Sequence, residues 1–317
     1  MATATPPAPP PPSPDPLAAA ERFMWLTARV LEQRRLAHCF RPGSAAEYAA
    51  DTVVTALEAY RSPDGGYGHG LDPDLRGPVS QPAHAAYALR VLDAAGRCAG
   101  RRVEEICRYL TAVSTRDGAL PAVDPALRGY PHAPWLAITG DPAADLTTTA
   151  PIVGLLHRNE VWHAWLFRAT DFCWAAIDSL GKTHPYEAEA AVAFLDGARD
   201  RQRAEAAADR LGRLVREQRL AVLEPERRDR YPVGDGYAPG DHHFPHDYAR
   251  RPDSVARRWF SEEEMARSLD YLAAEQQDDG GWPVRRRSWA QLPALESRPI
   301  ATLEALLTLR AYGRLAN

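Results

Sequence analysis

A short sequence that begins with Asp-Gly recurs along this chain at multiples of one spacing. It stands at Asp64, at Asp117 and at Asp279, so that the first interval is 53 residues and the second is 162, close to three times 54. Each copy follows a segment with helical periodicity. A unit of about 53 residues has room for two helices and two loops, and six such units would fill the 317 residues of the chain. The spacing therefore predicts six repeated helical hairpins.

Apolar residues recur with helical rather than strand periodicity. Val103, Ile106 and Leu110 follow the i, i+3, i+7 pattern of an amphipathic helix, and no segment shows strand alternation. Ser261 and Glu264 have the spacing of a capping box, which predicts a helix start. The segment 300–312 is apolar nearly all round, as is typical of a helix enclosed by others. We expect an all-α chain of eleven or twelve helices.

Repeated helical hairpins either stack into an open solenoid or close into a ring. An open solenoid needs polar capping helices at both ends, whereas the last expected helix here is apolar. The sequence therefore favours an (α/α)6 toroid. We expect one such domain over residues 17–317, preceded by a disordered tail over residues 1–16, half of which are proline.

Composition excludes several classes of protein. The formal net charge is −4, which argues against a nucleic-acid partner, and no apolar run is long enough to span a membrane. The first sixteen residues have neither a basic start nor an apolar core, so we expect no signal peptide. The four cysteines form no CxxC pair, which is typical of free thiols in the cytoplasm. We expect a cytoplasmic protein of undetermined oligomeric state.

Two of the repeated turns resemble known motifs. The segment 276–282, Gln-Gln-Asp-Asp-Gly-Gly-Trp, is similar to the QW motif of squalene and oxidosqualene cyclases. The Asp-Gly-Gly-Tyr of residues 64–67 resembles the repeats of protein prenyltransferase β subunits. The chain thus resembles the terpenoid cyclase and protein prenyltransferase superfamily, including small prenyltransferase/squalene-oxidase repeat proteins. The resemblance implies an (α/α)6 toroid whose central cavity, in larger members, holds an isoprenoid chain.

These motifs also have a structural interpretation. A Gly-Gly pair permits a tight reversal with positive φ between an outer and an inner helix, and the preceding Asp can accept hydrogen bonds from freed backbone groups. We expect Trp282 to fill a gap between helices and Gln276 or Gln277 to bridge the loop ends.

The loop after the first motif carries a compact titratable cluster, which we predict to be catalytic. It consists of His69, Asp72, Asp74 and Arg76, with Pro73 fixing the directions of the two carboxylates. If both carboxylates faced a dry cavity, repulsion and desolvation would raise one pKa and produce a proton donor. In the alternative interpretation, Asp74 caps a turn and Asp72 pairs with Arg76.

Neither initiation motif of terpene cyclases is present. Asp72-Pro73-Asp74 is followed by Leu75, so the Asp-x-Asp-Asp motif of protonation-initiated enzymes is incomplete. Asp278-Asp279 lacks the fifth-position aspartate of the magnesium-binding Asp-Asp-x-x-Asp motif. Both departures put ordinary terpene cyclisation in doubt without excluding an altered acid.

Aromatic and charged residues near the expected cavity are candidates for contact with substrate. In a cyclase-like cavity aromatic faces stabilise carbocations, although most tryptophans of an all-α protein serve packing. Glu296 and Arg298 form either a buried pair, which we favour, or cavity-lining groups. The predicted substrate-binding residues are Tyr67, Trp135, Trp165, Trp282, Glu296 and Arg298.

The segment 241–247, Asp-His-His-Phe-Pro-His-Asp, contains good zinc ligands. Because Pro245 separates His242 from His246, these side chains cannot share a regular helical face, and no cysteine is near. We interpret the segment as a solvated loop, either free or forming a lid over the cavity mouth, and predict no metal site. His184 and Pro185 indicate a helix start whose Glu187 and Glu189 form a solvated acidic face.

The combined hypothesis is a terpenoid-cyclase-like enzyme that acts on a small hydrophobic, isoprenoid-type substrate by acid-initiated cyclisation or isomerisation. No cofactor is predicted, and magnesium would be needed only for a diphosphate substrate. Two alternatives remain. A carbohydrate-active (α/α)6 hydrolase or lyase would need a Trp-lined groove with two carboxylates about 5–10 Å apart. A non-catalytic ligand- or partner-binding toroid would leave Asp72 and Asp74 exposed and bonded to the loop backbone.

Overall fold

The computed structural model describes residues 15–41, 46–233 and 240–315, and within these ranges it contains twelve α-helices and no β-strand. The chain is all-α, as predicted. The helices are α1 (Pro16–Thr27), α2 (Val30–Phe40), α3 (Ala46–Glu58), α4 (Pro82–Ala94), α5 (Arg101–Val113), α6 (Leu146–Arg158), α7 (Ala164–Ser179), α8 (Pro185–Gly197), α9 (Arg201–Glu217), α10 (Pro245–Tyr248), α11 (Glu262–Ala274) and α12 (Gln291–Ala311). Three short 3-10 helices lie at Pro125–Leu127, Pro225–Arg230 and Arg257–Trp259.

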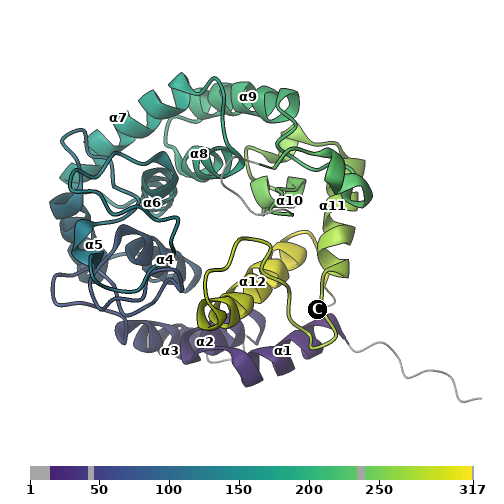
Figure 1. Ribbon diagram of the computed structural model, residues 1–317, viewed down its shortest axis with the longest axis horizontal. Coiled ribbons are helices and arrows are strands. Elements are labelled where there is room, and N and C mark those ends of the chain that lie inside the picture. Colours follow the sequence, from purple (N-terminus) through teal and green to yellow (C-terminus); the bar gives the residue numbers. More distant parts are fainter. Residues whose placement is uncertain (1–14, 42–45, 234–239, 316–317) are drawn as a thin grey trace, which may run out of the picture.

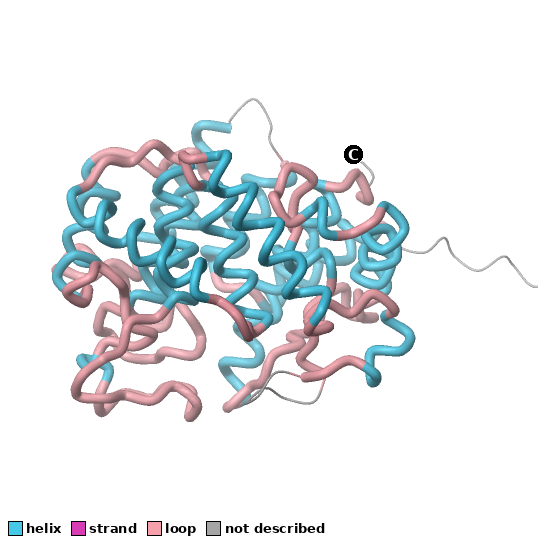
Figure 2. The backbone as a smooth tube through the Cα atoms, turned by 90° about the horizontal axis from the view of Figure 1, so that it is seen from above, coloured by secondary structure: helices cyan, strands magenta, loops and turns pink. Residues whose placement is uncertain are grey.

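The helices form two concentric layers that close into a ring (Figure 1). Helices α3, α5, α7, α9 and α11 lie outside, whereas α4, α6, α8, α10 and α12 lie inside. Helices α1 and α2 close the ring, because α1 packs against α12 and α2 packs against both α3 and α12. Seen from the side, loops lie at both ends of the helical layers, and long loops hang from one end (Figure 2). The predicted toroid of helical hairpins is therefore present.

Two predicted boundaries need correction. Residues 1–14 of the expected tail lie outside the described residues, but Pro16 is the first residue of α1, with the Asp15 side chain as its cap. Proline suits this position because a helix has no use for the N–H of its first residue. The last helix begins at Gln291 rather than at residue 300 and contains Pro299.

The three Asp-Gly turns have the predicted geometry. Gly65, Gly118 and Gly280 have φ values of 87°, 86° and 91°, a region that favours glycine. Each turn follows an outer helix, namely α3, α5 and α11, which is why the second spacing is three repeats long. Asp64 Oδ1 accepts the N–H of Gly66 at 2.9 Å, and Asp279 Oδ1 accepts that of Gly281 at 3.0 Å. The aspartates thus stabilise the reversals, as expected.

Each of these glycines also lies against the backbone of the next outer helix. A Cβ atom on Gly65 would lie 2.8 Å from the Glu105 carbonyl oxygen, and one on Gly280 would lie 2.2 Å from that of Ala19. Gln276 completes the last contact, since its Nε2 donates to the carbonyls of Pro16 and Gly280, both at 2.9 Å. The turn at Gly280 therefore joins the last hairpin to α1.

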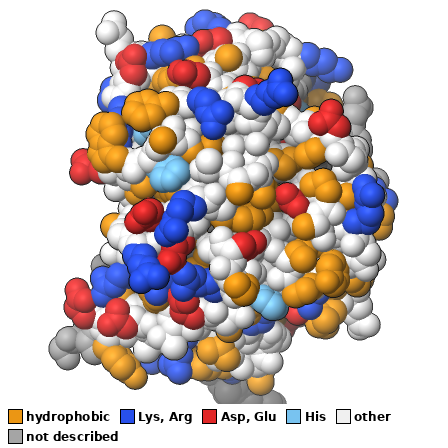
Figure 3. Space-filling view, turned by 90° about the vertical axis from the view of Figure 1, so that its left-hand side faces the viewer, with side chains coloured by type: hydrophobic (Ala, Val, Ile, Leu, Met, Phe, Trp, Pro, Cys, Tyr) orange, Lys and Arg blue, Asp and Glu red, His pale blue; other side chains and the backbone are white. Residues whose placement is uncertain are grey.

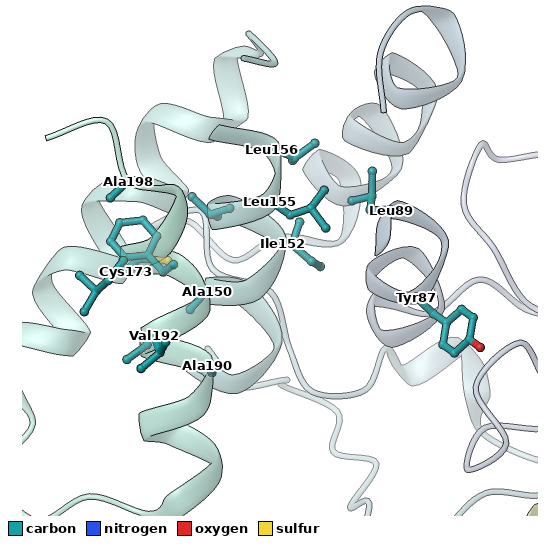
Figure 4. Close-up of a cluster of buried hydrophobic side chains, with 14 of the residues drawn as sticks. Tyr87, Leu89, Ala150, Ile152, Leu155, Leu156, Cys173, Ala190, Val192 and Ala198 are labelled. Carbon is teal, nitrogen blue, oxygen red and sulfur yellow. The ribbon is translucent and has the colours of Figure 1, made fainter. Parts of the chain in front are cut away.

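Inner helices α6 and α8 approach each other closely (Figure 4). A Cβ atom on Gly154 would lie 2.2 Å from the Ala193 carbonyl oxygen, so no larger residue fits without displacing a helix. Buried Ile152, Leu156 and Val192 pack around this contact as part of the largest apolar cluster.

A buried ionic cluster ties α2 to the loop before α4. Glu32 is fully buried and accepts two hydrogen bonds from Arg29, at 2.9 and 3.0 Å, and one from the Tyr87 hydroxyl at 2.8 Å. Arg29 also donates to the carbonyls of Gly70 at 2.9 Å and Leu71 at 3.1 Å. Because every charge in this cluster is paired, its burial is tolerated.

We expect Gly280→Ala to lower the free energy of unfolding by about 3 kcal/mol, because backbone strain and the clash with Ala19 act together. Gly96→Ala is the matched control, since Gly96 has a φ of 65° but no atom within 4 Å of the added Cβ. It should cost only about 1 kcal/mol. Urea denaturation of both variants measures the difference, and equal losses would contradict the close contact.

Candidate functional site

A cavity of about 210 Å³ lies inside the ring, between α8, α10, α11 and α12. Leu272, Trp282, Ile300 and Ala305 give it an apolar side. The remaining wall is rich in charge and includes five carboxylates and three arginines. These are Glu189, Asp241, Asp247, Glu275, Glu304, Arg250, Arg285 and Arg286. The cavity thus combines apolar surface with concentrated titratable groups, the usual composition of a functional site.

The segment 241–247 forms part of this wall, so the prediction of a solvated loop is wrong. The exposed fractions of Asp241, His242, His243 and His246 are 7%, 8%, 5% and 3%. The segment is buried because it leads into α10, which occupies an inner-layer position between α8 and α12 (Figure 1). The ring of Phe244 also stacks on Tyr271 with centroids 4.5 Å apart.

Asp247 is held as an anion. Its Oδ1 lies 2.8 Å from Arg285 Nη2, and its Oδ2 accepts the backbone N–H of Phe244 at 2.8 Å. Burial alone would raise the pKa of Asp247, but the charges of Arg285 and its other neighbours hold it well below the usual range. This carboxylate remains ionised at any working pH.

His246 beside it is uncharged at neutral pH. Arg285 Nη2 lies 3.4 Å from His246 Nε2, and Ser268 Oγ lies 2.6 Å from Nδ1. Since a guanidinium can only donate, Nε2 must accept, which places the ring proton on Nδ1, where it is donated to Ser268. Burial lowers the pKa of His246 to about 4, and the attraction of Asp247 offsets this only in part.

Asp241 has the opposite environment. The Tyr186 hydroxyl donates to its Oδ1 at 3.1 Å. Burial raises the pKa of Asp241, although Tyr186, His243 and Arg285 each oppose the shift. One cavity therefore holds two carboxyl groups whose environments move their pKa values apart, an arrangement that suits one as an acid and the other as a fixed charge.

A charged network forms the opposite part of the wall. Arg250 donates to Glu189 at 2.7 Å and to Glu304 at 3.1 Å, and His243 Nε2 lies 3.3 Å from Glu189. The predicted helix start at His184 is confirmed, with a capping box to Glu187. The predicted solvated position of Glu189 is wrong, because α8 belongs to the inner layer and turns this residue toward the cavity.

The histidines of segment 241–247 do not converge. His242 lies against the Tyr231 carbonyl at 3.2 Å, whereas His243 and His246 face Glu189 and Ser268. Across the described residues, no group of three or more His, Cys, Asp or Glu side chains could hold a metal ion.

The predicted catalytic cluster lies beside the cavity rather than around it. Asp74 is 9% exposed, pairs with Arg286 and accepts the Trp289 indole N–H at 3.2 Å. Burial raises its pKa against the opposing charge of Arg286. Asp72 Oδ1 accepts the backbone N–H of Asp74 at 2.9 Å, and His69 is exposed. Arg286 lines the cavity and thereby links Asp74 to it.

Two expected ion pairs have other partners. Arg76 pairs with Glu296 of α12 rather than with Asp72, and Asp72 rather than Asp74 caps the turn. Arg298 makes a bidentate contact with Asp279, at 2.7 and 2.9 Å, so the favoured Glu296–Arg298 pair is wrong. Residues 296 and 298 lie on different sides of α12, which separates their side chains.

Of the six predicted substrate-binding residues, the structure brings Trp282 to the cavity wall. Its indole N–H donates to the Leu272 carbonyl at 2.7 Å, so it also fills the gap between helices as expected. Tyr67 is fully buried in the core, and Trp165 is buried with its N–H bonded to the Gly118 carbonyl. Trp135 is 37% exposed beneath the Arg287 guanidinium, 5.3 Å from its ring.

Sequence reasoning missed Asp241, Tyr186 and the Arg285–Asp247 pair. The dense Asp and His run was noticed, but its proline argued for a loop. The repeat length held the missing signal, since the fifth hairpin required an inner helix between α9 and α11. Pro245 is the first residue of that helix.

Solved structures with the same fold include type II terpene cyclases. The chain aligns with an Asp-to-Ala variant of the type II terpene cyclase MstE from Scytonema, in complex with the product merosterolic acid A. The TM-score is 0.56 and the identity 14%, over 93% of this chain and 96% of that one. MstE in complex with geranylgeranyl dihydroxybenzoate aligns at 0.51 and 15% identity, over 95% and 88%. A protein from Actinoplanes aligns at 0.54 and 16%, over 94% and 89%.

The chain has the α/α toroid fold of type II terpene cyclases. No family model and no curated protein matches its sequence. Within the described residues, no helix is both long and apolar enough to cross a membrane.

The lowered pKa of His246 predicts a loss of stability in mild acid. The unfolded chain takes up a proton near pH 6.5, whereas the folded chain does so only near pH 4. The contribution of His246 is therefore complete above pH 6.5 and lost toward pH 4. We expect the free energy of unfolding to fall by about 2 kcal/mol between pH 7 and pH 5.

Urea denaturation at both pH values tests this. In His246→Gln the fall should be much smaller, whereas in the control His132→Gln it should persist. If the free energy of unfolding of His246→Gln fell as much as that of the wild type, the pH dependence would belong to other groups.

Proposed function

We propose that the protein is a terpenoid-cyclase-like enzyme that isomerises or cyclises a short, uncharged isoprenoid by protonating it. The observation that carries the proposal is the cavity of the toroid, which holds Asp241 beside the permanently ionised Asp247. Burial raises the pKa of Asp241, which favours the protonated form, and a protonated carboxyl group can donate its proton to a carbon–carbon double bond.

The proposed reaction balances in atoms and charge with the substrate and Asp241 alone, and it needs no further reactant. The Asp241 O–H proton passes to one alkene carbon and leaves a carbocation on the other. A second double bond of the same chain attacks that cation and closes a ring. Loss of a proton from a neighbouring carbon to the Asp241 carboxylate regenerates both the double bond and the acid. Tyr186, which donates to Asp241, would steady the carboxylate between the two steps.

The charges of the cavity suit a cation. With Asp241 protonated, the four remaining carboxylates of the wall face three arginines. Two of the arginines are already paired to lining carboxylates, Arg250 with Glu189 and Glu304, and Arg285 with Asp247. The third, Arg286, pairs with Asp74. This excess of negative charge stabilises a carbocation and disfavours a diphosphate. The proposal therefore needs no magnesium.

The cavity also limits the size of the substrate. Pockets for drug-sized ligands usually measure about 300–1,000 Å³, and this one is about 210 Å³. A chain of ten or fifteen carbons is thus favoured over longer ones. Asp72 and Asp74 were the donors expected from the sequence. Asp74 is the alternative acid, because it meets the cavity through Arg286.

The test is incubation of the purified protein with linear isoprenoid alcohols, hydrocarbons and diphosphates, with and without magnesium, followed by gas chromatography with mass detection. We expect a cyclised or isomerised product from an uncharged short chain. Asp241→Asn should reduce its rate at least about 100-fold, the usual contribution of a general acid.

Asp74→Asn should have the smaller effect, since Asp74 does not line the cavity. Asp270→Asn is the control, because this carboxylate is 65% exposed and pairs with Arg314. A product that forms equally well in Asp241→Asn and is lost in Asp74→Asn would transfer the acid to Asp74. If no isoprenoid gave a product, the enzyme hypothesis would be rejected in favour of a non-catalytic, ligand-binding toroid.

The initial rate has a predicted pH dependence. Because the protonated form of Asp241 is the active one, the rate should fall as pH rises through its raised pKa. A rate that instead rises with pH over this range would argue for a base in place of an acid.

A further inference from the structure

A second pocket lies outside the ring of inner helices. It has a volume of about 280 Å³ and is enclosed by the end of α6, by α7, by the end of α8 and by the segment that leads into α9. It shares no lining residue with the central cavity. Helix α8 separates the two, since Tyr186 and Glu189 line the cavity whereas Phe194 and Ala198 line this pocket. The proposed cyclisation makes no use of it.

The walls of this pocket are aromatic. Trp174 and Phe194 form its floor, with their rings edge to face and centroids 4.9 Å apart, and both are buried. Trp162 and Phe167 line it as well, yet they are 73% and 67% exposed. Rings exposed to this extent add little to the packing of the core. Phe167 and the face of Trp162 that Arg199 does not cover therefore remain available to a bound molecule.

Six of the thirteen lining residues have polar side chains, and three of these, Asp171, Arg199 and Asp200, are charged. His157 Nε2 lies 2.7 Å from Thr170 Oγ1, and burial, with the nearby charge of Arg199, lowers the pKa of His157, so its ring is neutral at neutral pH. The Arg199 guanidinium stacks over the Trp162 ring at 3.8 Å. Asp200 caps α9 by accepting the N–H of Arg203 at 3.0 Å.

We propose that this pocket is a binding site for a small, uncharged, aromatic or alicyclic molecule. Its four aromatic residues, Trp162, Phe167, Trp174 and Phe194, offer apolar contact, and the neutral His157–Thr170 pair offers hydrogen bonds that need no charge on the ligand. Figure 3 shows the side of the ring on which α5 and α7 lie, where groups of apolar side chains stand beside charged ones.

Fluorescence titration with N-phenyl-1-naphthylamine tests the proposal. This probe is uncharged and aromatic, and its emission rises in apolar surroundings. We expect one saturable site per chain. The double variant Trp162→Ala/Phe167→Ala should weaken binding at least about tenfold, because each ring supplies one face of the site. Both residues are exposed, so the melting temperature should be unchanged.

Trp25→Ala is the matched control, since Trp25 is 58% exposed and belongs to α1. It should leave the dissociation constant unaltered. An unchanged constant in the double variant would overturn the proposal by placing the probe elsewhere, including the central cavity. The proposal would also be overturned if the wild-type protein did not bind the probe and formed a dimer that the double substitution dissociates. The exposed rings would then form an interface between copies of the chain. Each result is independent of whether the protein turns over an isoprenoid.

Discussion

Close contact between a left-handed glycine and the backbone of the next outer helix sets the distance between neighbouring hairpins. At Gly65, Gly118 and Gly280 the absence of Cβ lets the turn lie directly on the next outer helix, and at Gly280 that helix is α1. The contact is present at the turns that follow α3, α5 and α11, where it fixes the spacing between neighbouring hairpins. The inner helices that come after these turns, α4, α6 and α12, depend on it for their positions.

The chemistry of the cavity depends on which of its carboxyl groups have an arginine partner and which do not. The Arg285–Asp247 pair is fixed by the backbone of the 244–247 turn, which leaves Asp241 with a hydroxyl group rather than a guanidinium as its partner. A buried carboxyl group without a bound cation prefers its proton. The acid that we propose at this position would therefore arise from the distribution of partners, although the chain has no Asp-x-Asp-Asp motif.

The sequence was sufficient for the hairpins and insufficient for the site. Spacing, capping and periodicity are local or periodic properties, so the turns at residues 64 and 279 and the helix start at Ser261 were predictable. The Asp74–Arg286 pair joins residues 212 positions apart, and the Arg76–Glu296 pair joins residues 220 apart. Such pairs depend on how the ring closes, and local sequence patterns carry no information about that closure. The four-residue α10 was missed because it is too short to show periodicity.

The contact between α1 and the last hairpin also constrains the order of events during synthesis. Gln276 bonds to the Pro16 carbonyl across 260 residues, and α1 packs against α12. At translation rates of about 5–20 residues per second, α1 waits roughly 10–50 s for these partners. During that time Phe23 and Met24 lack the residues of α11 and α12 in their cluster, and only α2 can lie against them. The apolar surface of the first helix is thus exposed for part of the time that the chain is on the ribosome. Such surface promotes aggregation unless a chaperone covers it.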